Sequence, residues 1–145
     1  MLNQSNTIGL IGEQAFSLEA IKQDWHVLKP VSDKEAYDFV ITKDHVRFIK
    51  VQVKTAKQSQ LEGKHCAEKY QWSVCRRVNN IKVSYEDNDI DVFALYAIEE
   101  DAWFIIPTYF IESKTVSIPV EVVKNIGNAS KYKGFRNAWD MLSLC

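Results

Sequence analysis

The stretch RFIKVQVKTA, residues 47–56, alternates apolar and polar side chains, as a half-buried strand does. The segment YDFVI (37–41) has the same character, and TKDHV between them favours a turn, so the two segments are predicted to form a hairpin. Gln52 and Lys54 are two residues apart on the longer strand and therefore share a face. A strand that has a complete apolar face and also carries an amide and an ammonium on the other face needs a chemical explanation.

The register of this hairpin follows from its apolar residues. One register gathers four apolar side chains on a single face, and a slip of one residue would turn all of them outward. Directly opposed residues have Cβ atoms about 4.5–5.5 Å apart, so an aspartate then joins the amide and the ammonium on the other face. The pairs in this register are Phe39 with Val51, Ile41 with Ile49, and Asp38 with Gln52.

A helix is predicted before the hairpin, over about residues 7–23. One apolar stripe follows the spacing i, i+3, i+7, i+10. A second strip of largely small residues, with Glu13 among them, would let the helix approach a sheet closely. We therefore expect Glu13 to point at protein rather than at open water. The first stripe consists of Ile8, Ile11, Ala15 and Leu18, and the second of Gly9, Phe16 and Ala20.

The remaining segments favour one domain, residues 1–145, built around a central sheet. Short strands are predicted at 25–30 and 70–77, and two apolar runs at 90–98 and 102–107 are separated by a turn and predict a buried hairpin. The segment 130–144 has the apolar spacing of a closing amphipathic helix. Strands combined with helices at both ends indicate an α/β or α+β sandwich.

Composition excludes several classes of protein. The chain has 145 residues, of which 46% are hydrophobic and 26% charged, which is ordinary for a globular protein. No apolar run approaches the roughly 20 residues of a membrane span, and the first residues lack the basic start of a signal peptide. Three cysteines without a C-x-x-C pair support neither a disulfide framework nor a zinc finger. We expect a cytoplasmic protein with no membrane contact.

Charge is distributed unevenly along the chain. The net charge is −1, yet residues 54–82 carry seven basic and two acidic side chains, a net of +5, and residues 83–145 carry a net of −5. Such a basic segment is typical of a polyanion-binding surface, and an ordinary solvated loop rich in lysine explains it equally well. Its basic residues are Lys54, Lys57, Lys64, Lys69, Arg76, Arg77 and Lys82.

The residues around the hairpin suit a hard divalent cation. Glu13 and Asp38 offer carboxylates, Gln52 offers an amide oxygen, and Mg²⁺ prefers oxygen ligands completed by water and substrate phosphate. A bound ion of this kind polarises a phosphoryl oxygen and activates water. Lys54 could hold that water and offset charge on the phosphorus.

These segments resemble a known family. The pair GE (12–13), then YDFVI and VQVKTA, resemble the PD-(D/E)XK nuclease superfamily, in particular its small group I intron-associated homing endonucleases, and the likeness continues through DIDVFALYAIEEDAWFIIP (89–107). The resemblance implies a restriction-endonuclease-like core with a central mixed β-sheet flanked by helices. It implies a metal-dependent, site-specific endonuclease for double-stranded DNA, with Mg²⁺ as cofactor and Mn²⁺ as a substitute.

The resemblance also implies roles for individual residues. Glu13, Asp38, Gln52 and the backbone carbonyl of Val53 would bind the metal, and Lys54 would be the catalytic lysine. Two positions depart from the family pattern. Tyr37 stands where the family has proline, a mild change, and Gln52 stands where it usually has a carboxylate. The neutral amide removes one negative charge, so metal affinity should fall and a second bound metal is disfavoured.

Partners follow from the same reasoning. The expected DNA contacts are Lys57, Lys64, Lys69, Arg76, Arg77 and Lys82. One active site cuts one strand, so cleavage of a duplex implies a homo-oligomer, a dimer or a tetramer, and the apolar C-terminal third offers material for the interface. The resemblance places the protein with DNA in a bacterial or organellar compartment. A Holliday-junction resolvase or repair nuclease of the same fold, and a catalytically silent DNA-binding module, remain as alternatives.

Overall fold

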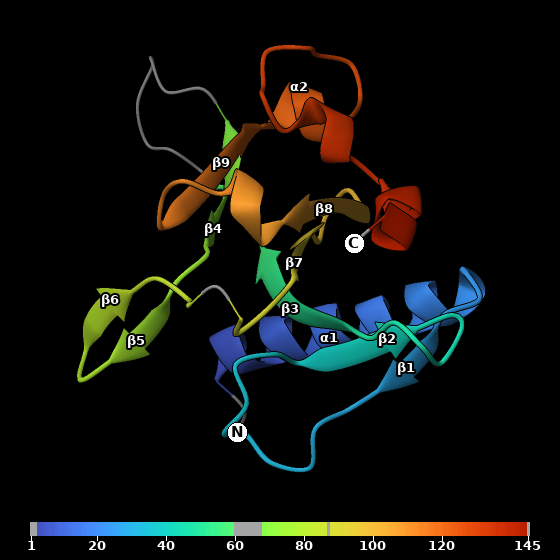
Figure 1. Ribbon diagram of the computed structural model, residues 1–145. Coiled ribbons are helices and arrows are strands. Elements are labelled where there is room, and N and C mark those ends of the chain that lie inside the picture. Colours follow the sequence, from blue (N-terminus) through green and yellow to red (C-terminus); the bar gives the residue numbers. More distant parts are fainter. Residues whose placement is uncertain (1–2, 60–67, 87, 145) are drawn as a thin grey trace.

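The computed structural model describes residues 3–59, 68–86 and 88–144, and a five-stranded mixed sheet forms its centre (Figure 1). The strand order is β1-β2-β3-β7-β8, in which β3 and β7 are parallel and the other neighbours antiparallel. A central sheet is what the sequence predicts, and its mixed character is what the resemblance implies. The strands are β1 (His26–Leu28), β2 (Phe39–Thr42), β3 (Ile49–Ala56), β7 (Val92–Ala97) and β8 (Ala102–Pro107).

The predicted register of the β2–β3 hairpin is confirmed. Phe39 pairs with Val51 and Ile41 with Ile49, and the backbone N–H of Asp38 donates to the carbonyl of Val51 at 2.9 Å. All four apolar side chains are buried. The β7–β8 hairpin is also confirmed, and all of its strand residues are buried. The apolar pattern sets the register because every alternative would expose this face to water.

The helix α1 (Gln4–Lys22) packs on one face of the sheet through the predicted strip of small residues. Phe16 and Ala20 are fully buried, whereas Ile11 and Leu18 of the other stripe are exposed. Gly12 completes the buried face, since a Cβ atom there would lie 1.7 Å from Oγ1 of Thr55 on β3. Glycine therefore sets how closely the helix approaches β3.

A second apolar core covers the other face of the sheet. There β4 (Lys69–Ser73) and β9 (Thr115–Pro119) form a separate antiparallel pair, followed by the short helix α2 (Val120–Val123). The sequence predicted one strand over 70–77, but β4 ends at Ser73 because Val74 and Cys75 are both buried and so break the alternation of faces. The N–H of Val74 donates instead to the carbonyl of Lys114 at 2.9 Å.

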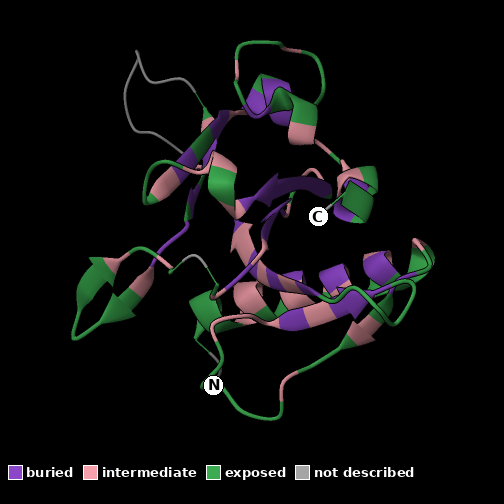
Figure 2. Ribbon diagram, viewed as in Figure 1, coloured by how far each residue is buried: buried purple, intermediate pink, exposed green. Residues whose placement is uncertain are grey.

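The strands β5 (Arg76–Val78) and β6 (Ile81–Val83) form a hairpin that the sequence reading did not predict. Its two-residue turn consists of Asn79 and Asn80, whose φ angles of 50° and 64° match the left-handed turns that connect hairpins. This ribbon stands away from the sheet (Figure 1), and most of its surface is exposed (Figure 2).

The C-terminal segment is not the predicted amphipathic helix. Two short 3₁₀ helices, η2 (Lys133–Phe135) and η3 (Trp139–Leu144), occupy it, and a third, η1 (Thr108–Phe110), follows β8. Asn137 separates the first two with a φ of 48°, and its side-chain oxygen accepts from the N–H of Trp103 at 3.0 Å. Pairing with β8 thus replaces helical hydrogen bonds, although Trp139 and Leu142 are buried as their spacing predicts.

No helix in the described ranges is both long and apolar enough to cross a membrane.

Candidate active site

Glu13 and Asp38 approach each other at the start of β2. Glu13 follows Gly12 on α1, and Asp38 precedes the first residue of β2; both are half-buried. The two carboxylates line a hollow of about 180 Å³, together with Lys29 and Tyr37. The close packing of α1 on β3, which Gly12 permits, brings Glu13 to this end of the sheet.

Asp38 is held in place by a hydrogen bond from β3. Its Oδ2 accepts a hydrogen bond from the N–H of Val53 at 2.8 Å. The pKa of Asp38 is raised to about 6, mainly by burial and additionally by the negative charge of Glu13, while the Val53 N–H, Lys54 and Lys29 act in the opposite direction. Two carboxylates held together in a half-buried site favour a positive charge between them.

Gln52 and Lys54 share one face of β3, and the alternate residues Val51 and Val53 pack with α1 in the core on the other face. Across the parallel pairing their neighbours in β7 are Phe93 and Leu95, which are buried. Burial lowers the pKa of Lys54, and Asp38 opposes that effect. The Nζ atom of Lys54 lies 6.0 Å from the centroid of the Tyr85 ring. The amide and the ammonium thus lie beside apolar core and near Asp38.

The backbone of Val53 faces the same place. In a strand the N–H and C=O of one residue point to the same side, and the N–H of Val53 points to Asp38. The carbonyl of Val53 is therefore directed to the side of β3 where β2 has not yet begun. This is the position in which the resemblance implies a backbone ligand.

The donor set of the site consists of oxygens. In residues 3–59, 68–86 and 88–144 no group of three or more histidine, cysteine, aspartate or glutamate side chains forms a metal cage. Two carboxylates, one amide and one backbone carbonyl supply only two negative charges. Such a set fits one hard divalent cation that keeps part of its water shell, and Glu13 and Asp38, which line one hollow, are the two members with negative charge.

The predicted DNA-binding residues lie in different parts of the structure. Lys57 is exposed and lines, with Lys54, a hollow beside the first turns of α1. Lys69 is half-buried on β4. Arg77 and Lys82 are exposed and directly opposite each other on the β5–β6 ribbon. Lys64 lies outside the described residues.

Arg76 stands apart from the other basic residues because it is half-buried and has acidic neighbours. Its guanidinium lies 3.9 Å from Asp89 and 4.0 Å from Glu86. These ion pairs hold the base of the ribbon against the loop that follows β6. Its expected contact with DNA stays a prediction.

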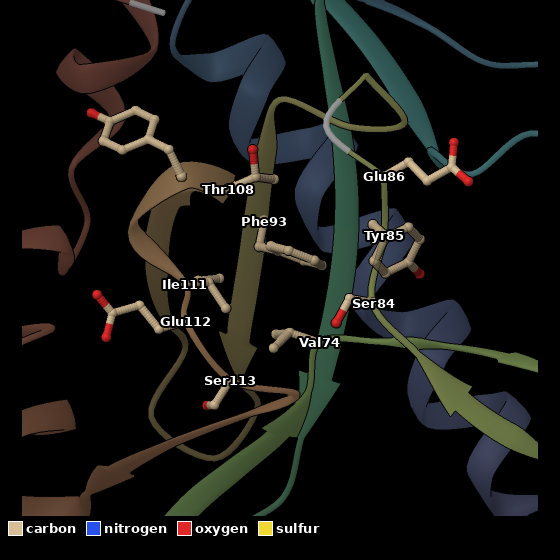
Figure 3. Close-up of a pocket in the computed structure, with 10 residues that line it drawn as sticks. Val74, Ser84, Tyr85, Glu86, Phe93, Thr108, Ile111, Glu112 and Ser113 are labelled. Carbon is tan, nitrogen blue, oxygen red and sulfur yellow. The ribbon is translucent and has the colours of Figure 1, made fainter.

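Tyr85 and Lys29 are the neighbours of the site that the sequence reading missed. Lys29 follows β1 and lines the hollow that contains Glu13 and Asp38. Tyr85 lines a larger hollow of about 540 Å³, which contains none of the predicted site residues (Figure 3). Its ring nevertheless lies near Lys54, whose Nζ is 6.0 Å from the ring centroid. Both residues are in irregular segments, where no periodicity in the sequence marks a side chain as facing the site.

Comparisons with known proteins show which family and which solved structure the chain is similar to. Residues 3–142 match a family model described as PD-(D/E)XK endonuclease. A solved structure, that of the bacterial homing endonuclease I-Ssp6803I, is 25% identical in sequence and matches with a TM-score of 0.79 over 97% of this chain and 93% of that chain. A search of curated proteins gave no match.

Proposed function

The chain belongs to the PD-(D/E)XK endonuclease family, and from this we propose that it is a metal-dependent, site-specific endonuclease of the homing type that cleaves double-stranded DNA. The observation that carries the proposal is the meeting of Glu13, Asp38 and Lys54 at one end of the β2–β3 hairpin. The similarity to a bacterial homing endonuclease over nearly the whole of both chains supports the homing type. Residues 1–145 would act as a single nuclease domain.

Each site residue has a role that its position supports. Glu13, Asp38, the amide oxygen of Gln52 and the carbonyl of Val53 would hold Mg²⁺ beside the scissile phosphate. When bound, the ion supplies Lewis-acid stabilisation of the phosphoryl oxygens. Lys54 would donate a hydrogen bond to the attacking water and balance charge that develops on the phosphate. The N–H of Val53 fixes the orientation of Asp38.

The β5–β6 ribbon is the element best suited to contact duplex DNA. Arg77 and Lys82 are paired directly across it, and like charges in that position repel each other unless an anion lies between them. Val78 and Ile81 on the same ribbon are 44% and 67% exposed. A two-stranded ribbon fits the major groove, so base contacts from it would give site specificity.

Cleavage of both strands requires two active sites, and we propose that two or more copies assemble. The apolar strands β7 and β8 of the C-terminal third are buried within the chain itself. The outer face of α1 is exposed instead, at Leu10, Ile11, Leu18 and Ile21. That stripe is apolar and unpartnered within the described chain, so it would serve as the contact between copies.

A plasmid cleavage assay tests the function. With Mg²⁺ or Mn²⁺ the protein should nick and then linearise DNA that carries its site, and a randomised duplex library should yield one pseudo-palindromic site. Lys54→Ala should keep binding that DNA and retain only a small residual rate of cleavage. The opposite outcome is a wild-type protein that binds DNA sequence-specifically and nicks it with neither metal. That result would establish the catalytically silent DNA-binding module, which the neutral Gln52 allows.

A further inference from the structure

Tyr85 lies between the DNA-facing ribbon and the catalytic strand. It follows β6 by two residues and is half-buried. Its ring packs edge-on against Phe93, with centroids 5.6 Å apart and planes at 67°. Phe93 is the β7 neighbour of Gln52. In Figure 3 the ring of Phe93 extends toward Tyr85, while Glu86 points away from both.

The ring of Tyr85 is the aromatic contact of the catalytic lysine. Nζ of Lys54 lies 6.0 Å from the ring centroid, at the limit within which a cation is attracted to an aromatic face. Burial, and after it the charge of Asp38, raises the pKa of Tyr85 to about 12, so its ring stays neutral. Its hydroxyl forms no hydrogen bond with any residue in the described ranges. The ring is therefore the part of Tyr85 that interacts with the ammonium of Lys54.

The same segment is tied to the ribbon. Glu86 and Asp89 flank the Arg76 guanidinium, and the N–H of Glu86 donates to Oδ2 of Asp89 at 2.8 Å. Tyr85 therefore belongs to a folded loop that joins the base of the ribbon to the face of β3.

We propose that Tyr85 is a positioning residue for Lys54, with its ring, backed by Phe93, holding the ammonium on the side of β3 where Asp38 lies. This inference rests on the proposed nuclease function. Tyr85 acts through the lysine and does not itself contact the substrate. The link to the ribbon makes the placement of the lysine depend on the element that meets DNA.

The test is a double-mutant cycle on nicking of a supercoiled plasmid with Mg²⁺. Tyr85→Leu, which removes the ring, should lower kcat on the order of tenfold and leave KM unchanged, the size expected of a partly desolvated cation–π contact. Tyr85→Phe, which keeps the ring, should retain nearly full kcat. In the Lys54→Ala background the Tyr85→Leu change should have no further effect. Tyr109→Leu is the matched control, because Tyr109 lines the same hollow and is 83% exposed.

A second readout does not need nuclease activity. The rate at which an acylating reagent modifies Lys54, followed by mass spectrometry, should change in Tyr85→Leu and stay the same in Tyr109→Leu. If the wild type cuts no DNA, this measurement alone decides the inference, while the proposed function fails separately. The positioning role would be overturned if Tyr85→Leu lowered kcat by the same factor with and without Lys54, or if it changed KM alone. It would also be overturned if Tyr85→Leu left the labelling rate of Lys54 unchanged.

Discussion

Asp38 carries a charge that the fold disfavours. Its pKa is about 6 in the folded protein, above the ordinary value of 3.8, with burial as the main cause and Glu13 as an additional one. Below pH 3.8 the carboxyl is protonated in both the folded and the unfolded protein, so it does not lower the free energy of unfolding. Between pH 3.8 and 6 the unfolded state loses its proton first, so stability falls as pH rises through this window. The penalty is complete above pH 6.

Replacement of Asp38 by asparagine should therefore stabilise the metal-free protein. In EDTA at pH 8 we expect the free energy of unfolding to rise by up to about 3 kcal/mol, the equivalent of the raised pKa, with little change at pH 3.5. Urea denaturation at the two pH values measures the difference. Asp44→Asn is the control of opposite sign, since hydrogen bonds from the N–H groups of Arg47 and Val46 lower the pKa of Asp44. Equal stability of Asp38→Asn and wild type at pH 8 would contradict the prediction.

Gln52 sets the charge of the proposed metal site. Gln52→Glu adds a third carboxylate beside Glu13 and Asp38, so metal affinity should rise by about tenfold or more, because each added anionic ligand favours a divalent cation. Calorimetric titration with Mn²⁺ measures this change. The same variant should be less stable than wild type in EDTA, since like charges in a half-buried site repel. Gln71→Glu, at an exposed position of β4, should alter neither quantity.

At the scale of elements, the packing of α1 on β3 depends on one glycine. A Cβ atom at Gly12 would lie 1.7 Å from Oγ1 of Thr55, while a Cβ atom at Gly9 would meet nothing within 4 Å. Gly12→Ala should cost about 1–3 kcal/mol of stability, as overpacking does, and should move Glu13 away from Asp38. Gly9→Ala should instead gain up to about 1 kcal/mol from helix propensity. Thermal unfolding of the two variants compares them directly.

Thr55 offers a check on that steric explanation. Its Oγ1 is buried and has no hydrogen-bond partner among the residues that the structure describes. Thr55→Ala removes the clashing atom without loss of a hydrogen bond, so it should restore part of the stability that Gly12→Ala removes. If the double variant is no more stable than Gly12→Ala alone, the close approach of helix and strand is not the cause.

The β5–β6 ribbon should account for part of the electrostatic affinity for DNA. Replacement of Arg77 and Lys82 by alanine removes two exposed charges, and each phosphate contact contributes about 0.9 to the slope of log affinity against log salt. The slope should therefore fall by roughly two if each residue meets one phosphate, with kcat little changed. Fluorescence anisotropy over a series of salt concentrations gives the slope. Lys22→Ala with Lys131→Ala, also exposed but outside the basic segment, should leave it unchanged.

At the scale of the whole molecule, the sequence predicted the sheet best where burial on one face restricted the register. Phe39, Ile41 and Val51 have only one arrangement that buries them all, so the hairpin and the faces of Gln52 and Lys54 followed. The ribbon escaped prediction because its strands are three residues long and exposed. The sequence feature that indicates this hairpin is the pair Asn79-Asn80, because asparagine favours the left-handed geometry of a two-residue turn.

The prediction of an amphipathic helix in the C-terminal segment was wrong for a different physical reason. Its apolar spacing correctly selected Trp139 and Leu142 as buried, but spacing does not reveal that a backbone has a strand edge to pair with. Asn137 and Arg136 contact β8, and this tertiary contact replaces the helix. Likewise Tyr85 reaches the site only through the folded loop after β6, a contact that local sequence does not encode.

Assembly of copies is the last expectation at this scale. Leu18 and Ile21 are 56% and 58% exposed on the outer face of α1, and Leu10 and Ile11 extend the stripe. An isologous contact between two such stripes would bury all of them and supply the second active site. Leu18→Glu should place two like charges at that contact and yield monomers in sedimentation experiments. The monomer should still nick one strand of a plasmid but lose concerted double-strand cleavage. Ile126→Glu is the control, because Ile126 is 77% exposed and lies outside this stripe; it should keep the wild-type assembly. An unchanged oligomer in Leu18→Glu would show that the copies meet through another surface.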